Sequence, residues 1–311
     1  MTSSDSPVSL PATEAADPVF ESLDSWPVAA QLGALWQSQL AAVAAIGPAL
    51  PSLALAVEAA LPRLQAGGSL VYAGAGSSAR LGTQDGAELE PTFDWPAERV
   101  VYLIAGGPQA LTRAVENAED DRAAGQDAVR AAGIRSQDVV IGVAASGRTP
   151  FTIGCLEEAR RLGALTIGVV NSPAAPLLEV TDHPVTVLTG SEPVAGSTRM
   201  KAGTAQKVVL NLLSTALMTG LGRVWRGRMV DMRARNEKLR QRAIRMVCVL
   251  TGCAEDVASD ALGQTDYRIK PAILVVSGLT PARAAACLEE AGGRLREAFT
   301  ISGVASRSRE T

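Results

Sequence analysis

Acidic residues gather in two stretches of this 311-residue sequence. Asp85, Glu88 and Glu90 form the first group, and the second spans residues 116–121. Two carboxylates that face one substrate can share proton abstraction and proton delivery, and burial by the substrate would keep one of them protonated as the acid. A structural alternative is open for the second group, because helical spacing over 109–132 would make it a solvated helix face.

Two loops of small and hydroxyl-bearing residues are candidates for binding a phosphate. GAGSSAR spans residues 74–80, and AASGRTP spans residues 144–150. Each follows an apolar run and opens a helical pattern, so backbone N–H groups and hydroxyls could together hold an anion, although Ser and Thr also cap helices for structural reasons. Two such loops in one sheet favour phosphate binding. The candidate residues are Gly76, Ser77, Ser78, Ser146, Gly147 and Thr149.

Nucleotide cofactors have little support. Residues 74–79 fit the GxGxxA pattern of dinucleotide-binding loops, but that pattern needs an acidic residue after the next strand to bind a ribose. The next apolar run is followed by Gly106 and Gly107 instead. The sequence also lacks the GxxxxGK[ST] pattern of Walker-type nucleotide sites.

Histidine and cysteine chemistry is equally disfavoured. His183, the only histidine, precedes Pro184 at the expected start of a strand, which favours a structural role over a catalytic triad. The four cysteines show no CxxC spacing and no local histidine, so reduced thiols are favoured over a zinc site or a disulfide framework. We expect neither a metal nor a cofactor.

Short apolar runs predict the strands that position these loops. They cover residues 69–74, 100–105, 138–144, 165–170 and 184–188. Helical patterns at 109–132 and 150–162 separate the middle runs, which indicates an α/β fold with a parallel sheet covered by helices on both faces. Ligands bind such sheets at the carboxyl ends of the strands.

Further helices are expected before and after the residues that form the sheet. Residues 23–64 predict two or three of them, and the others are predicted at 202–221, 229–250, 254–262, 281–291 and 294–299. Residues 273–276 could form a strand or part of a buried helix. We expect a disordered tail over 1–18, an α/β domain with N-terminal helices over 19–245, and a small helical domain over 246–311.

The composition narrows the class of protein. Hydrophobic residues make up 47% and aromatic residues 4%, so a full core can form and would pack by close approach of helices to the sheet. A net charge of -3 favours neither nucleic acid nor an anionic membrane as a partner. We expect no apolar stretch of membrane-spanning length, and a cytoplasmic location because the N-terminus lacks a signal-peptide pattern.

A longer motif resembles one family. Residues 190–207 read GSEPVAGSTRMKAGTAQK, and NLLST at 211–215, MVD at 229–231 and NEKL at 236–239 follow. Together they strongly resemble N-acetylmuramic acid 6-phosphate etherases. The loops at 74–80 and 144–150 resemble the sugar isomerase (SIS) domain of that family, and glucokinase regulatory proteins share much of the pattern. The resemblance covers roughly residues 64–299.

The resemblance implies a three-layer αβα SIS domain, a small C-terminal helical domain and a homodimer. It implies an enzyme of cell-wall recycling that cleaves the D-lactyl ether of N-acetylmuramic acid 6-phosphate, an amino-sugar phosphate, by elimination. Water then adds to give N-acetylglucosamine 6-phosphate. The catalytic glutamates of the family correspond to Glu88, which would act on the proton at carbon 2, and Glu119, its partner acid or base.

Other residues of the long motif could contact the substrate, or could form turns and subunit contacts. These are Glu192, Ser197, Arg199 and Lys201. A non-catalytic sugar-phosphate-binding regulator and an aldose–ketose isomerase are alternatives on the same fold. Retention of both glutamates favours an enzyme over the regulator, and residues 196–207 argue against the isomerase. The chain departs from the family pattern at Ala79, at Glu90 and over residues 20–39.

Overall fold

The computed structural model describes residues 14–232, 234 and 236–305. The chain divides into two compact units. Unit 1 contains the residues up to Gly86 and Glu98–Leu213, and unit 2 contains Ala87–Ala97 and the residues from Ser214 onward. Two helices, α3 (Gly76–Phe93) and α6 (Lys201–Gly220), contribute residues to both units.

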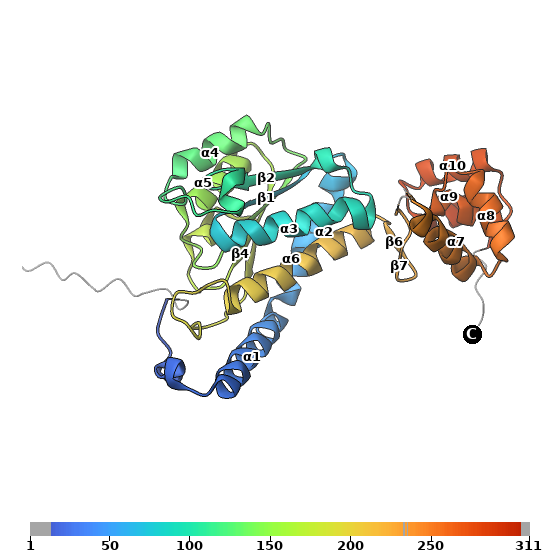
Figure 1. Ribbon diagram of the computed structural model, residues 1–311. Coiled ribbons are helices and arrows are strands. Elements are labelled where there is room, and N and C mark those ends of the chain that lie inside the picture. The colour runs from blue at the N-terminus through green and yellow to red at the C-terminus, as the bar shows by residue number, and fades with distance from the viewer. Residues whose placement is uncertain (1–13, 233, 235, 306–311) are drawn as a thin grey trace, which may run out of the picture. The chain divides into compact units, whose positions relative to one another are not determined.

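Unit 1 is built around a five-stranded parallel sheet in the order β2-β1-β3-β4-β5 (Figure 1). The strands are β1 (Leu70–Gly74), β2 (Val100–Ile104), β3 (Val139–Ala144), β4 (Leu165–Val170) and β5 (His183–Thr186). The strands β1, β3 and β4 are buried along their whole length, which explains their unbroken apolar runs. The five expected strands and the parallel sheet are confirmed.

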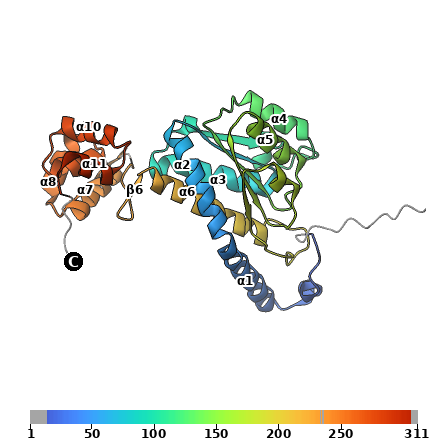
Figure 2. The same ribbon diagram turned by 180° about the vertical axis from the view of Figure 1, so that it is seen from behind.

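Helices cover both faces of this sheet. One layer consists of α4 (Arg122–Ala131) and α5 (Pro150–Arg161), and the other contains α2 (Leu50–Gln65), α6 and the first turns of α3 (Figure 2). The layer formed by α4 and α5 packs very closely. A Cβ atom on Gly125 would lie 2.1 Å from the carbonyl oxygen of Phe151, and one on Gly154 would lie 2.1 Å from that of Arg122.

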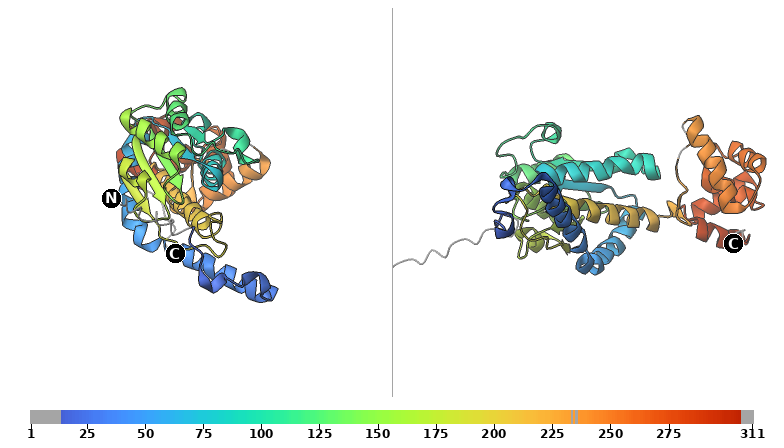
Figure 3. Two further views of the ribbon diagram at one scale, coloured as in Figure 1. Left: turned by 90° about the vertical axis from the view of Figure 1, so that its left-hand side faces the viewer. Right: turned by 60° about the horizontal axis from the view of Figure 1, so that its bottom comes forward.

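Helix α1 (Val28–Ala44) extends away from the sheet, and the 3₁₀-helix η3 (Gly47–Ala49) joins it to α2 (Figure 3). The stretch Val28–Gln65 is long and apolar enough to span a membrane by length and composition, so the expectation that no stretch reaches that length is wrong. Only 28% of its most apolar window is buried. A core helix or a signal sequence passes the same test, which makes this weak evidence for a membrane span.

Unit 2 is helical apart from a short hairpin. The hairpin pairs β6 (Val224–Trp225) with β7 (Arg228–Met229), and the helices are α7 (Glu237–Thr251), α8 (Glu255–Gly263), α9 (Ile269–Val276), α10 (Pro281–Glu290) and α11 (Leu295–Ser302). Residues 273–276 are therefore helical. The helix expected over 229–250 begins only at Glu237, because the hairpin occupies the preceding residues and the Asn236 side chain caps the helix.

The predicted domain boundaries differ from the division into units. The boundary expected between residues 245 and 246 falls inside α7. The expected tail over 1–18 lies mostly outside the described residues, although Asp17 accepts the N–H of Val19 at the start of the 3₁₀-helix η1 (Pro18–Phe20). The three-part division stays a prediction.

Candidate functional site

The loop after β1 leads directly into a helix, as an anion-binding loop requires. Helix α3 begins at Gly76, two residues after the end of the strand. The first N–H groups of a helix have no partner within the helix, so those of Ser77 and Ser78 belong to its positive end. Ser77 is half-buried and Ser78 is buried. This local geometry can bind an anion through the backbone.

The loop after β3 lies at the same edge of the sheet. Strands β1 and β3 are paired neighbours, with Gly74 opposite Val143 near their carboxyl ends. In this loop the hydroxyl of Ser146 accepts the N–H of Arg148 at 3.2 Å, and Thr149 precedes α5. Gly147 has a φ of +64°, and a Cβ atom there would lie 2.3 Å from that of Ala175. A side chain at position 147 would therefore disrupt the loop.

A buried chain of hydrogen bonds connects the start of α3 with α6 and with the residue after β4. The hydroxyl of Ser78 donates to Gln206 Oε1 at 2.9 Å, and Gln206 Nε2 donates to Asn171 Oδ1 at 2.9 Å. Asn171 Nδ2 then donates to the carbonyl oxygen of Val187 at 3.1 Å. A carbonyl oxygen can only accept, so it sets the orientation of both amides and directs the proton of Ser78 toward Gln206.

This chain changes the expected role of Ser78. A hydroxyl that donates its proton to Gln206 cannot donate it to a phosphate as well. The backbone N–H of Ser78 remains suited to an anion, whereas its side chain belongs to the buried network. Sequence reasoning did not select Gln206 or Asn171. Gln206 could have been found through its place in the 190–207 motif, but only the order of the strands brings Asn171 to it.

Two residues of the long motif help to start α6. Glu192 is 1% exposed, and its two carboxylate oxygens accept the backbone N–H groups of Lys201 at 2.8 Å and Ala202 at 2.9 Å. A carboxylate at this end of a helix also complements the helix dipole. The ammonium group of Lys201 donates to the carbonyl oxygen of Ser191 at 2.9 Å. In the same segment Ser197 is half-buried and Arg199 is exposed.

Asp85 is the buried member of the first acidic group. It accepts hydrogen bonds from the hydroxyl of Tyr72 at 2.8 Å and from Asn211 Nδ2 at 3.0 Å. Burial, followed by the charge of Asp85, raises the pKa of Tyr72 well above its ordinary value, so the phenol stays protonated. Asp85 therefore joins α3, β1 and α6, while Glu88 is exposed and Glu90 is half-buried farther along α3.

Arg223 anchors the end of α3 within unit 2. Its Nη1 donates to the carbonyl oxygens of Phe93 at 2.7 Å and Asp94 at 2.8 Å, and its guanidinium lies 5.1 Å from the centre of the Trp95 ring. Lys270 and Asp231, which are 2.6 Å apart, line a cavity of about 710 Å³ together with Arg223. These contacts hold the last turn of the helix that carries Glu88.

The second acidic group does not lie on a helix: the helix expected over 109–132 is confirmed only over α4 (Arg122–Ala131), and its earlier part is wrong. The 3₁₀-helix η5 (Pro108–Leu111) is followed by turns and bends, and Asn117 has a φ of +58°. Asp121 accepts the N–H of Ala124 and caps α4. The carbonyl oxygen of Glu119 accepts the N–H of Phe151 at 3.0 Å, two residues after Thr149. The backbone of Glu119 therefore lies beside the start of α5.

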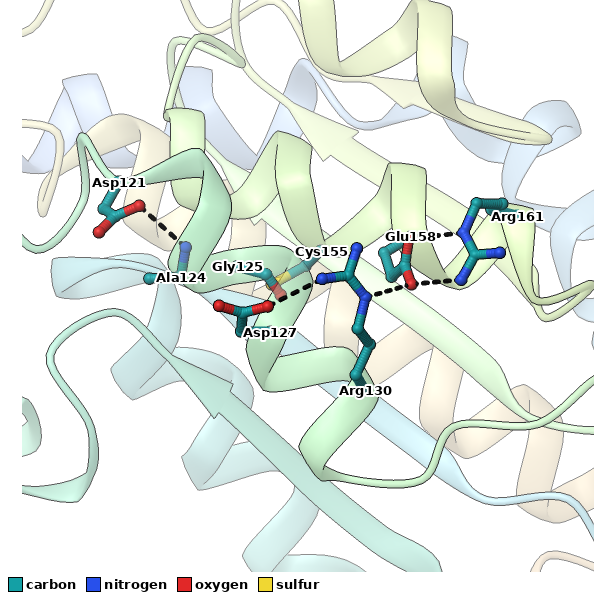
Figure 4. Close-up of polar contacts among 8 residues, drawn as sticks. All are labelled: Asp121, Ala124, Gly125, Asp127, Arg130, Cys155, Glu158 and Arg161. Atoms are coloured by element: carbon teal, nitrogen blue, oxygen red, sulfur yellow. Dashed lines mark hydrogen bonds and ion pairs between the residues drawn. The ribbon is translucent and has the colours of Figure 1, made fainter.

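The single histidine and the cysteines take no visible part in this site. His183 is the half-buried first residue of β5. All four cysteines are free, and burial raises the pKa of Cys155 to about 12. Cys155 lies against Gly125 between α4 and α5 (Figure 4). A thiol in this setting is a poor nucleophile.

Comparison with known proteins decides the family. A model of the glucokinase regulatory protein N-terminal SIS domain matches residues 52–160, and a model of the SIS domain matches residues 117–216. The N-acetylmuramic acid 6-phosphate etherase of Deinococcus radiodurans is 50% identical over 286 residues, which cover 92% of this chain and 94% of that protein. The chain belongs to the N-acetylmuramic acid 6-phosphate etherase family.

Another etherase and a solved structure extend the comparison. The N-acetylmuramic acid 6-phosphate etherase of Cronobacter sakazakii is 45% identical over 92% of this chain and 97% of its own length. A phosphoheptose isomerase from Francisella tularensis shares 19% identity with a TM-score of 0.46, covering 64% of this chain and 98% of that one. The etherase relatives confirm the family resemblance, and the SIS family model with the parallel sheet and its two helical layers confirms the three-layer SIS fold with its helical C-terminal region.

Proposed function

We propose that the chain is an N-acetylmuramic acid 6-phosphate etherase. The observation that carries this proposal is 50% identity with a named etherase over 92% of the chain. The site geometry supports it: two anion-binding loops leave neighbouring strands at one edge of the sheet, and the backbone of Glu119 lies beside the second loop. The products are D-lactate and N-acetylglucosamine 6-phosphate.

The proposed reaction is a carbon–oxygen lyase reaction followed by hydration. In the open-chain sugar the aldehyde acidifies the proton at carbon 2, so a carboxylate can remove it. The electron pair forms a double bond between carbons 2 and 3, and the bond from carbon 3 to the lactyl oxygen breaks. The second carboxyl group protonates that oxygen, and D-lactate leaves. Water then adds at carbon 3 while a proton returns to carbon 2.

In this proposal two glutamates transfer protons and the residues of the two loops bind the phosphate. Glu88 acts at carbon 2, and Glu119 serves the lactyl oxygen and the incoming water. The backbone at the start of α3 and the hydroxyls of Ser77, Ser146 and Thr149 bind the 6-phosphate. The cytoplasmic location stays a prediction, which the free cysteines support.

A homodimer is supported by one face of α1. The exposed apolar side chains of this face follow helical spacing, and they are Val28, Leu32, Trp36, Leu40 and Val43. Each is between 44% and 69% exposed, and the helix contains no charged residue. A two-fold axis would pair this face with itself, and an apolar, uncharged stripe is complementary to its own copy.

Release of D-lactate tests the function directly. The protein is incubated with N-acetylmuramic acid 6-phosphate, and lactate is measured with D-lactate dehydrogenase. We expect the wild-type protein to release D-lactate and Glu88→Gln and Glu119→Gln each to lower kcat by about 10²- to 10⁴-fold. Exchange of the carbon 2 proton in D₂O shows which glutamate is the base, because only the variant that lacks the base loses exchange.

Two other results would contradict the proposal. Binding of the substrate without lactate release in the wild-type protein would indicate a regulator. Conversion of an aldose phosphate to a ketose phosphate without lactate release would indicate an isomerase.

A further inference from the structure

Helix α7 of unit 2 ends in a turn that places two cysteines beside each other. Gly252, the residue after the helix, has a φ of +77°, and its N–H donates to the carbonyl oxygen of Cys248 at 2.7 Å. This hydrogen bond and the left-handed glycine form a helix end in which the chain turns back along the last turn of the helix. Cys253 directly follows the glycine, and Cys248 lies four residues before it. The side chains at these two positions commonly meet in such a helix end.

Two further observations agree that the thiols are neighbours. Both side chains are half-buried, and both pack against the same hydrophobic core of unit 2. Burial, followed by the charge of Cys253, raises the pKa of Cys248 to about 11. Charges act strongly on a thiol only over a short distance. Cys248 and Cys253 are therefore a pair of adjacent free thiols that solvent can still reach.

The other two cysteines are shielded from solvent. Cys155 in α5 and Cys287 in α10 are each 0% exposed. The thiolate is the reactive form of cysteine, and an apolar interior disfavours it. Within the ranges that the structure describes, no group of three or more His, Cys, Asp or Glu side chains could hold a metal ion. Oxidation, rather than metal binding, is therefore the chemistry open to Cys248 and Cys253.

We infer that Cys248 and Cys253 are a redox-responsive pair, which a low-molecular-weight disulfide oxidises to a reversible disulfide bond across the end of α7. The bond closes a ring of residues 248–253 and links α7 to the short connection that leads into α8. Thiols in a reducing compartment stay free, so the bond forms only when the oxidant accumulates. The pair takes no part in the proposed etherase reaction.

The oxidation is a thiol–disulfide exchange in two steps. The Cys253 thiolate attacks one sulfur of the oxidant, the S–S bond of the oxidant breaks, and the departing thiolate takes up a proton. Cys253 is now an uncharged mixed disulfide, so its charge no longer raises the pKa of Cys248. Cys248 loses its proton and attacks the Sγ atom of Cys253, which releases the second half of the oxidant as a thiol. Two protein thiols are oxidised, and one oxidant disulfide is reduced to two thiols.

Mass spectrometry of the full-length native protein tests this pair. The protein is incubated with glutathione disulfide, and the remaining thiols are blocked with N-ethylmaleimide in denaturant. Trypsin then releases residues 246–268 as one peptide that contains both cysteines. We expect this peptide to be about 2 Da lighter than its reduced form and to carry no N-ethylmaleimide, because two thiol hydrogens are lost. Cys155 and Cys287 are internal controls and should both be blocked, and dithiothreitol should restore both thiols of the pair.

Two single substitutions distinguish the thiol that is attacked first from the thiol that completes the bond. Cys248→Ser removes the second attack, so we expect Cys253 to retain one glutathione and its peptide to gain about 305 Da. In Cys253→Ser the remaining thiol holds its proton more firmly, and we expect about tenfold less glutathione on it in the same time. Serine is similar to cysteine in size and both positions are partly exposed, and circular dichroism checks that each variant is folded.

Three results would overturn the inference. The first is a wild-type peptide 246–268 that retains glutathione or both free thiols at an oxidant concentration that modifies Cys248→Ser. The second is a disulfide that joins two chains, which a non-reducing gel shows as a covalent dimer. The third is equal uptake of glutathione by the two variants, which contradicts the order of attack. None of these measurements uses lactate release, so the failure of this inference and the failure of the proposed function are distinguishable.

Discussion

The two helical layers that cover the sheet of unit 1 differ in the partners of their polar side chains. In the α4–α5 layer exposed arginines pair with a buried carboxylate: Arg130 and Arg161 both donate to Glu158, whose side chain is 3% exposed (Figure 4). In the α3–α6 layer the buried Asp85 accepts hydrogen bonds from the neutral Tyr72 and Asn211. The neutral Ser78 and Gln206 belong to one directed chain of hydrogen bonds. Exposed guanidinium groups can rearrange around a carboxylate, whereas a buried amide chain ending on a carbonyl oxygen has one satisfied arrangement.

This difference suggests separate tasks for the two layers. The α4–α5 layer depends on close backbone packing and contributes mainly to the stability of unit 1. The α3–α6 layer connects the start of α3 with the end of β4 through Gln206 and Asn171, so we expect a substitution that breaks this amide pair to change substrate binding as well as stability. Substitutions in each layer test this division.

The largest expected effect is on the packing of α4 against α5. In Gly125→Ala the new methyl group would overlap the carbonyl oxygen of Phe151, and we expect a loss of about 3 kcal/mol in the free energy of unfolding. Gly33→Ala in α1 is the matched control, because its methyl group meets nothing within 4 Å. The control should gain about 0.5–1 kcal/mol. Urea denaturation followed by circular dichroism measures both, and equal stability of the two variants would contradict the packing argument.

The next effect concerns the direction of the buried amide chain. Gln206→Glu keeps the shape of the side chain but removes the N–H that Asn171 accepts, which should cost about 2 kcal/mol at neutral pH and raise KM. Protonation of the introduced carboxyl group restores a donor to Asn171. Burial should raise its pKa in the folded state, so the loss should shrink as the pH falls. A loss that does not depend on pH would refute the directed chain.

A smaller effect distinguishes two serines that sequence analysis treats alike. Ser146→Ala should weaken binding of inorganic phosphate by about 1 kcal/mol, because a hydroxyl donor is lost. Ser78→Ala should change phosphate binding less than twofold, since its proton already serves Gln206. Inhibition of lactate release by inorganic phosphate measures both variants. Equal weakening would place the hydroxyl of Ser78 on the phosphate.

These examples show which features the sequence can predict. The strands and the two loops were predictable because each strand is buried on both faces, which leaves an unbroken apolar run ending in small residues. The surroundings of Glu119 were not predictable from the sequence. The turn around it depends on the left-handed conformation of Asn117 and on the hydrogen bond from the N–H of Phe151 to the carbonyl oxygen of Glu119. The predicted start of α7 at residue 229 precedes the observed start at Glu237. A two-residue hairpin strand is too short to show an alternation of apolar and polar residues, so the sequence did not reveal it.

The smallest expected effect is the acid sensitivity of the charged layer. Hydrogen bonds from Arg161 and then from Arg130 lower the pKa of Glu158 to about 2. A carboxyl group with a lowered pKa in the folded state stabilises the protein above its ordinary pKa of about 4.5, and this stability is lost as the pH falls toward 2. Between pH 5 and 3 the melting temperature of Glu158→Gln should therefore fall less than that of the wild-type protein.

Asp127→Asn is the control, because it removes an exposed partner of the same Arg130 and leaves Glu158 in place. Its melting temperature should fall with acidification as the wild-type value does. If both variants follow the wild-type curve, the ion pairs of the α4–α5 layer contribute little and close packing at Gly125 and Gly154 alone stabilises it. Glu158→Gln and Gln206→Glu should both lose less stability relative to the wild-type protein as the pH falls, so these pH trends do not separate the layers. The separation comes from KM, which should change only for Gln206→Glu.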